Sequence, residues 1–370
     1  MRKSFSLFFG ALCAFSASAQ GLKDTYQDAF LVGSIASNQQ LNQPDASTNA
    51  LFKREFNVLT AENDMKWQRI HPAPNRYNFS QADALMQQAA QCECEVVGHT
   101  LIWHQQTPDW VFEDDAGNPV SREALLDRMQ SHIFNLMTRY QGKVIGWDVV
   151  NEALNEDGSL RDSRWRKIIG DDYIAKAFRF AAMADPDAEL YYNDYNLNSP
   201  AKRDGAVRLV KSLLDQGIKI TGIGMQAHYQ LAFPAIEQIE DSITAFASLG
   251  VDVMITELDI SVLPFPKQAA IGAEISERAD FADELNPYAD GLPESVQQAL
   301  AMRYAELFTL FYQHKDDISR VTFWGTHDGT SWKNNWPVRG RTDYPLLFDR
   351  SGKRKLAYDA VAAVPSAMAQ

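Results

Sequence analysis

Short apolar runs, rich in β-branched residues, alternate along this chain with longer segments in which apolar positions recur at helical spacing. Runs of this kind are typical of strands that are buried on both faces of a parallel sheet. Several of them end abruptly in amide, carboxylate or aromatic residues. The runs predict eight strands, at 31–36, 58–63, 95–101, 144–152, 189–195, 220–225, 251–260 and 321–325.

The segments between the runs carry helix signals. Ser80 with Asp83 three residues later is typical of a helix start, and Gly142, Gly217 and Gly250 each follow a helical segment, where glycine commonly ends a helix. Only a short helix fits between the first two strands. The other predicted helices cover 80–90, 121–140, 172–184, 202–216, 235–249, 295–314 and 355–363.

Strict alternation of strand and helix requires parallel strands, and eight such units in a chain of this length predict a closed (β/α)₈ TIM barrel in the α/β class. The single catalytic domain would cover 20–370. An open, doubly wound sheet is the structural alternative. One acidic segment, at about 264–293 after the seventh strand, breaks the alternation. It is expected either to border a substrate cleft or to be a solvated loop.

The first residues have the zones of a secretory signal peptide: two basic residues after Met1, an apolar stretch, and small residues up to Ala19. We expect a signal peptide at 1–19 and a secreted or periplasmic protein. A lipoprotein signal is disfavoured, because Leu12 precedes Cys13. No later apolar run approaches the roughly 20 residues that span a bilayer, so no membrane insertion is expected.

Composition excludes some partners. The chain has 370 residues, of which 45% are apolar and 22% charged, and its formal net charge is −13. Such acidity disfavours nucleic acid, which is bound by clustered Lys and Arg. After signal removal only Cys92 and Cys94 remain. A disulfide between them would be strained, and two cysteines without further ligands are a poor metal site. Two free thiols are therefore expected.

Polar clusters fall at the predicted carboxyl ends of seven strands. In a (β/α)₈ barrel these ends converge on the face that holds the active site. A single His or Trp at a strand end is usually part of the core, but the joint pattern indicates a functional face. These residues are Glu62, Asn63, Lys66, His99, Trp103, Gln106, Asn151, Glu152, Asn193, Tyr195, Gln226, His228, Glu257, Asp259, Trp324 and His327.

Two glutamates, Glu152 and Glu257, lie near the ends of two apolar strands that are far apart in sequence. Retaining glycosidases need two carboxyl groups about 5–5.5 Å apart, one to attack the anomeric carbon and one to protonate the leaving oxygen. The pair therefore suggests glycosidase chemistry. Two buried carboxylates with a merely structural role are the alternative, which is costly without partners.

Four motifs carry a resemblance to a known family. They are ENDMKW at 62–67, HTLIWHQQ at 99–106, WDVVNE at 147–152 and ITELD at 255–259. Together they resemble the signatures of family 10 glycoside hydrolases, the retaining endo-β-1,4-xylanases. The resemblance covers nearly the whole mature chain, with the motifs in the expected order.

The resemblance implies roles for individual residues. Glu257 would be the nucleophile and Glu152 the acid/base, which an ionised Glu257 nearby would keep protonated near neutral pH. His228 would hydrogen-bond the nucleophile, and Asp259 would orient that histidine. The substrate-binding set it implies comprises Glu62, Asn63, Lys66, His99, Trp103, Gln106, Asn151, Tyr195, Gln226, His228, Trp324 and Trp332.

The expected substrates are xylan and xylo-oligosaccharides, hydrolysed by a monomer without metal or organic cofactor. Trp324 and Trp332 would fill the space that the hydroxymethyl group of glucose needs. Alternatives are a β-glucanase on the same barrel and a non-catalytic carbohydrate-binding protein. The remaining tryptophans are expected to be packing residues, although Trp336 could touch substrate: Trp67, Trp110, Trp147, Trp165 and Trp336.

Overall fold

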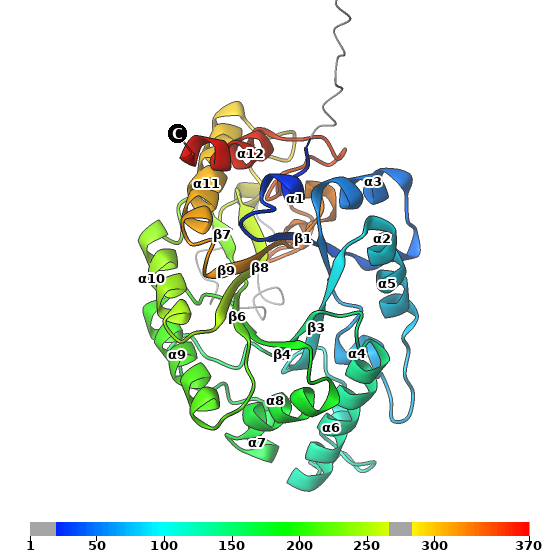
Figure 1. Ribbon diagram of the computed structural model, residues 1–370. Coiled ribbons are helices and arrows are strands. Elements are labelled where there is room, and N and C mark those ends of the chain that lie inside the picture. Colours follow the sequence, from blue (N-terminus) through cyan, green and yellow to red (C-terminus); the bar gives the residue numbers. More distant parts are fainter. Residues whose placement is uncertain (1–19, 266–282, 370) are drawn as a thin grey trace, which may run out of the picture.

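The computed structural model describes residues 20–265 and 283–369 (Figure 1). The signal peptide predicted for 1–19 and the middle of the acidic segment predicted for 264–293 lie outside the described residues. None of the helices in the described part of the chain is both long and apolar enough to cross a membrane.

The strands form a closed parallel barrel. Eight of them follow one another in the order β6, β5, β4, β3, β2, β1, β9 and β8, and β6 pairs with β8 to close the ring. The predicted TIM barrel is confirmed, and the open doubly wound sheet is excluded. The barrel strands are β1 (Leu31–Ala36), β2 (Val58–Ala61), β3 (Glu95–Trp103), β4 (Gly146–Asn151), β5 (Glu189–Asp194), β6 (Gly222–Met225), β8 (Asp252–Ser261) and β9 (Ile318–Phe323).

Helices surround this ring, as Figure 1 shows for α5, α6, α8, α9, α10 and α11. Two helices, and not one short helix, connect β1 to β2, and a short extra strand β7 (His228–Gln230) pairs with the end of β8. The helices are α1 (Leu22–Thr25), α2 (Asn38–Asn42), α3 (Ala46–Glu55), α4 (Trp67–Ile70), α5 (Ser80–Cys92), α6 (Arg122–Arg139), α7 (Arg164–Ile169), α8 (Tyr173–Ala184), α9 (Pro200–Asp215), α10 (Ile236–Ala247), α11 (Glu294–Gln313) and α12 (Leu356–Met368).

Local sequence explains the helix positions. Ser121 caps α6, because its hydroxyl accepts a hydrogen bond from the backbone N–H of Ala124 at 3.2 Å. Along α6 the buried residues Leu125, Met129 and Ile133 recur every four positions. This spacing places them on one face of the helix, which packs against the barrel.

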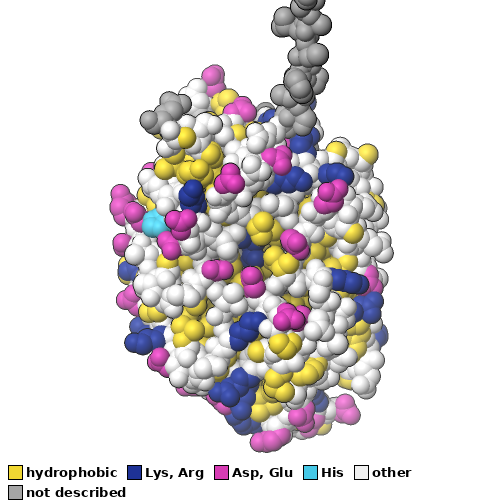
Figure 2. All heavy atoms as spheres, viewed as in Figure 1, with side chains coloured by type: hydrophobic (Ala, Val, Ile, Leu, Met, Phe, Trp, Pro, Cys, Tyr) yellow, Lys and Arg dark blue, Asp and Glu magenta, His cyan; other side chains and the backbone are white. Residues whose placement is uncertain are grey.

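One end of the barrel is sealed. The first halves of the strands contribute a small buried cluster of Val58, Val97, Tyr191 and Met254. The guanidinium of Arg320, on β9, lies 5.2 Å from the ring centroid of Tyr191 and is buried. Side chains therefore fill this end, which leaves the carboxyl ends of the strands for the functional site. Figure 2 shows acidic and basic side chains scattered together over the face in view.

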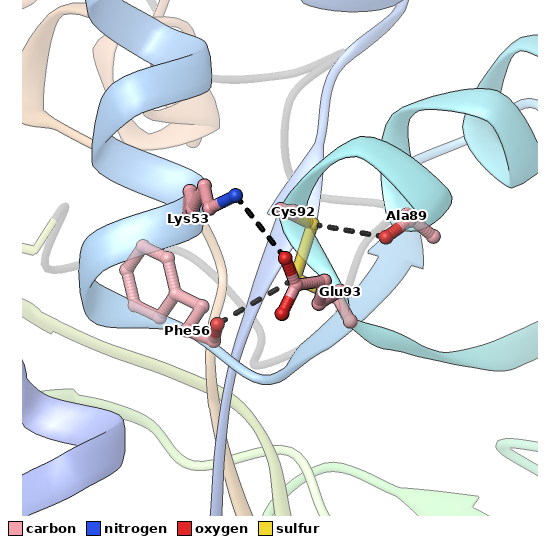
Figure 3. Close-up of a disulfide and its surroundings, with 6 residues drawn as sticks. Lys53, Phe56, Ala89, Cys92 and Glu93 are labelled. Atoms are coloured by element: carbon pink, nitrogen blue, oxygen red, sulfur yellow. Dashed lines mark hydrogen bonds and ion pairs between the residues drawn. A yellow bond between two sulfur atoms is a disulfide. The ribbon is translucent and has the colours of Figure 1, made fainter.

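The cysteine prediction is wrong: Cys92 and Cys94 form a disulfide (Figure 3). Their Cα atoms are 5.3 Å apart, within the range that a disulfide spans. Glu93 between them has φ of +60°, the left-handed conformation that ends α5 and turns the chain toward β3. The carboxylate of Glu93 also pairs with Lys53 at 3.1 Å. The sequence spacing alone did not reveal this turn.

Candidate active site

The carboxyl ends of the strands line one cavity. Glu152 directly follows β4, and its φ of +56° turns the chain sharply out of the sheet. Glu257 lies within β8. Both side chains line the cavity although each residue is about nineteen-twentieths buried. All twelve residues predicted to bind substrate also line it: Glu62, Asn63, Lys66, His99, Trp103, Gln106, Asn151, Tyr195, Gln226, His228, Trp324 and Trp332.

Neutral donors hold the Glu152 carboxylate. The indole Nε1 of Trp103 donates to Oε2 at 2.8 Å, and the amide Nε2 of Gln226 donates to Oε1 at 3.0 Å. Burial raises the pKa of Glu152, but the interaction with His104 and these two hydrogen bonds outweigh it, so the net shift is downward. In the protein without substrate, the pKa of Glu152 is therefore shifted in the direction opposite to the expected one.

A charged relay holds the Glu257 carboxylate. The imidazole Nε2 of His228 lies 3.1 Å from Oε2 of Glu257, and its Nδ1 lies 3.0 Å from Oδ1 of Asp259. Burial lowers the pKa of His228, but Asp259 and the two hydrogen bonds outweigh it and raise the pKa. A protonated imidazole can donate to both carboxylates at once. The contacts on which the predicted roles of His228 and Asp259 depend are thus present.

Asn193, on β5, contacts the candidate site residues; the sequence placed it at a strand end but indicated no role for it. Its Nδ2 donates to Oε1 of Glu257 at 2.9 Å and to Oδ1 of Asn151 at 3.0 Å. The hydroxyl of Thr256 donates to the side-chain oxygen Oδ1 of Asn193 at 2.6 Å, which fixes the orientation of the side-chain amide. Asn193 therefore links the nucleophile candidate to Asn151, the residue beside Glu152.

Hydrogen bonds preorganise the polar group from β2. Asn63 Oδ1 accepts from Lys66 Nζ at 2.9 Å and from Gln106 Nε2 at 3.1 Å. The Lys66 ammonium also lies 4.8 Å from the ring centroid of Trp103. Burial raises the pKa of Glu62 and lowers the pKa of Lys66. Asn63, Lys66 and Gln106 therefore present donors and acceptors held by hydrogen bonds to the cavity, as recognition of sugar hydroxyls requires.

Aromatic rings form a further part of the cavity wall. Trp332 and Trp336 stack with centroids 4.7 Å apart, and Trp336 lines the cavity, so it is not only a packing residue. His99 is held by Asp148 at 2.8 Å and meets Trp324 edge-on at 5.4 Å. Flat apolar rings of this kind stack on the CH faces of sugars.

Other predicted packing tryptophans lie elsewhere. Trp67, Trp147 and Trp165 are fully buried in the core, as expected.

Phe265, at the start of the segment predicted to border the cleft, lines the cavity, and its ring centroid lies 5.7 Å from that of Trp336. The described edge of that segment therefore does reach the site.

Arg161, which the sequence did not indicate, joins the backbone of Glu152 to the side chain of Tyr195. Arg161 Nε donates to the backbone oxygen of Glu152 at 3.1 Å, and its Nη2 donates to the hydroxyl of Tyr195 at 2.8 Å. Lys202 lies 3.4 Å from the Tyr195 ring centroid and pairs with Asp194 at 2.9 Å. No pattern in the sequence indicates that Arg161, in the loop after β4, folds back onto this strand end.

The arrangement suits acid–base and nucleophilic chemistry on a neutral, hydroxyl-rich ligand. Two carboxyl groups meet in one cavity with different partners, and polar and aromatic side chains surround them. Within the described residues, no group of three or more His, Cys, Asp or Glu side chains has the geometry of a metal site.

Comparison with known proteins agrees with this site. The chain is 46% identical over 359 residues to an endo-1,4-beta-xylanase A of Xylanibacter ruminicola, covering 96% of this chain and 97% of the relative. It is 42% identical over 357 residues to a beta-1,4-xylanase of Dictyoglomus thermophilum, covering 96% and 94%.

Among solved structures, a family 10 endoxylanase retrieved from sugarcane soil metagenome superimposes with a TM-score of 0.88 at 42% identity, covering 93% of this chain and 99% of that one. The family model described as glycosyl hydrolase family 10 matches residues 21–364. The fold, the two carboxylates and these matches agree, and the chain belongs to glycosyl hydrolase family 10.

Proposed function

We propose that this protein is an endo-1,4-β-xylanase that hydrolyses internal bonds of xylan with retention of anomeric configuration. The observation that carries the proposal is the pair Glu152 and Glu257 in one cavity, with neutral donors on the first and a charged relay on the second. Relatives that align along nearly the whole chain are named as xylanases, which supports the substrate class.

In the first step, a carboxylate oxygen of Glu257 attacks the anomeric carbon and forms a glycosyl ester. Glu152 gives its proton to the departing glycosidic oxygen as that bond breaks, so the leaving chain departs as a neutral alcohol. Asn193 and His228 keep Glu257 aimed, since each contacts one of its two oxygens.

In the second step, Glu152 takes a proton from water, and the water oxygen attacks the same carbon and releases Glu257. Glu152 must therefore be protonated first and ionised later. Substrate buries Glu152 further, and burial is the largest influence raising its pKa. A sugar hydroxyl that engages Gln226 would weaken one hydrogen bond favouring the ionised form. Loss of the Glu257 charge in the ester then allows the proton to leave.

Substrate choice follows from the walls of the cavity. Trp324 and Trp332 line the cavity and would fill the space that the hydroxymethyl group of glucose needs, so xylose would fit better than glucose. Lys66, Asn63 and Glu62 would bind hydroxyls on the non-reducing side, and Tyr195 would lie on the leaving-group side. We further infer secretion through the segment 1–19 and action as a monomer.

The test is to incubate the mature protein with linear xylohexaose and, in parallel, with cellohexaose, and to follow the products by chromatography. Internal cleavage of xylohexaose, with cellohexaose much slower, is the expected result. Preference for cellohexaose would contradict the proposed substrate but would leave the proposed mechanism unchanged. The absence of cleavage in both would favour a binding protein instead.

A further inference from the structure

A buried lysine lies in the aromatic wall of the cavity. Lys333, in the short helix η5 (Trp332–Asn334), is 4% exposed. Its ammonium lies 4.6 Å from the ring centroid of Trp332 and 4.7 Å from that of Trp336. Burying an ammonium costs free energy unless a charge partner compensates it. A wall that only stacks on neutral sugars needs no cation, so Lys333 requires a further explanation.

The charge partner is the relay behind the nucleophile. Lys333 Nζ lies 3.6 Å from Oδ1 of Asp259, the same oxygen that faces His228. Asp259 and Glu257 carry two negative charges, and a protonated His228 supplies only one positive charge. Lys333 supplies the second and makes the group of four neutral.

The groups that face this relay come from several elements. Glu257 and Asp259 face His228 from β8, and Lys333 faces it from the final loop. Further out, Lys66 interacts electrostatically with Glu257 from the loop after β2. Burial raises the pKa of Tyr304, on α11, and the charge of Asp259 raises it further. Burial also raises the pKa of Asp343, and the charge of Lys333 opposes this rise. Lys333 is therefore a cation that faces Asp259 from the final loop, on the same carboxylate oxygen that faces His228.

The same contacts fix the aromatic wall. The indole Nε1 of Trp332 donates to Oδ2 of Asp259 at 2.7 Å, while Oδ1 serves His228 and Lys333. The ring centroid of Trp332 also lies 4.8 Å from that of His228, and Trp336 stacks on Trp332 with ring centroids 4.7 Å apart. Through Asp259, one lysine is tied both to the imidazole that aims Glu257 and to the two rings that shape the cavity.

Resting on the proposed function, we propose that Lys333 is a positioning residue for the nucleophile: its charge balances Asp259, so that His228 and the Trp332–Trp336 wall keep one arrangement around Glu257. Lys333 does not touch the reacting atoms. It acts through Asp259 and His228.

The test compares Lys333→Met, which keeps the length of the side chain and removes the charge, with Lys333→Arg, which keeps the charge. Lys353→Met, at an exposed position, is the matched control. The first measurement is an NMR titration of His228 in protein labelled at the histidine ring carbon. Since Lys333 lowers the pKa of His228, Lys333→Met should raise it, whereas Lys333→Arg and the control should leave it near the original value.

The second measurement is turnover of an aryl xylobioside with a good leaving group. Lys333→Met should lower kcat by about tenfold with little change in KM, because a displaced nucleophile slows the attack. An unchanged His228 titration in Lys333→Met, or a rise in KM alone in both variants, would overturn the proposal. If the unmodified protein cleaved no xylose oligomer, the proposed function would fail, whereas the titration would still show whether the charge of Lys333 acts on His228.

Discussion

Glu152, directly after β4, and Glu257, within β8, line one cavity, yet different partners hold their carboxylates. Glu152 accepts from the indole of Trp103 and the amide of Gln226, both neutral donors. Glu257 accepts a hydrogen bond from Asn193 and faces His228. Asp259 contacts both His228 and Lys333. Neutral donors can exchange with substrate hydroxyls, whereas a charged relay resists exchange. The difference suits one residue that changes protonation state and one that stays ionised.

The largest effect should come from removing each carboxylate. Glu257→Ala should abolish turnover even of aryl xylobiosides with good leaving groups, because no nucleophile remains. Glu152→Ala should lose about 10²–10⁴-fold on xylan, the usual contribution of general acid–base catalysis, but should still release a burst of a good leaving group. Stopped-flow measurement of aryl release checks this, and equal losses in the two variants would refute the assignment.

A smaller effect should appear in the pH dependence when a neutral donor is removed. Trp103→Phe deletes a hydrogen bond that lowers the pKa of Glu152, so that pKa should rise. Because Glu152 acts first as an acid, the alkaline limb of kcat/KM should move to higher pH.

The matched control for that change is Trp110→Phe, which alters an indole that packs against Trp67 and Arg128. Its pH profile should coincide with that of the original protein. A Trp103→Phe profile that also coincides with it would mean that Trp103 does not set the protonation of Glu152.

The smallest effect should come from the disulfide, which lies at the end of α5, where the chain enters β3, away from both glutamates. Replacing Cys92 and Cys94 by Ser should lower the free energy of unfolding by about 1.5 kcal/mol, the chain-entropy value for so short a loop. Denaturant titration measures this loss. Turnover should not change, and a matching fall in kcat would show that this end of the barrel is coupled to the site.

Strand positions and strand-end residues were predictable because both follow from local pattern. Parallel strands read as apolar runs, and a closed barrel brings their carboxyl ends together whatever their separation in sequence. Glu152, Glu257 and His228 were therefore identified without knowledge of their contacts. Their roles as acid/base, nucleophile and relay remain predictions.

Contacts made by loops were not predictable. Arg161 and Lys333 lie after strands, in segments whose return path depends on tertiary packing, so no spacing marks them. The left-handed turn at Glu93 hid the disulfide for a related reason, since it depends on how α5 meets β3. The pKa shift of Glu152 was predicted in the wrong direction because His104, Gln226 and Trp103, which lower that pKa, approach Glu152 only in the folded barrel.

The central claim is that Glu257, and not Glu152, bonds to the sugar. The most direct measurement is to incubate the protein with a 2-deoxy-2-fluoro xylobioside that carries a good leaving group, and to locate the added mass by peptide mass spectrometry. One xylobiosyl group on the peptide that contains Glu257 is the expected result. A label on the Glu152 peptide, or turnover with no covalent label, would contradict it.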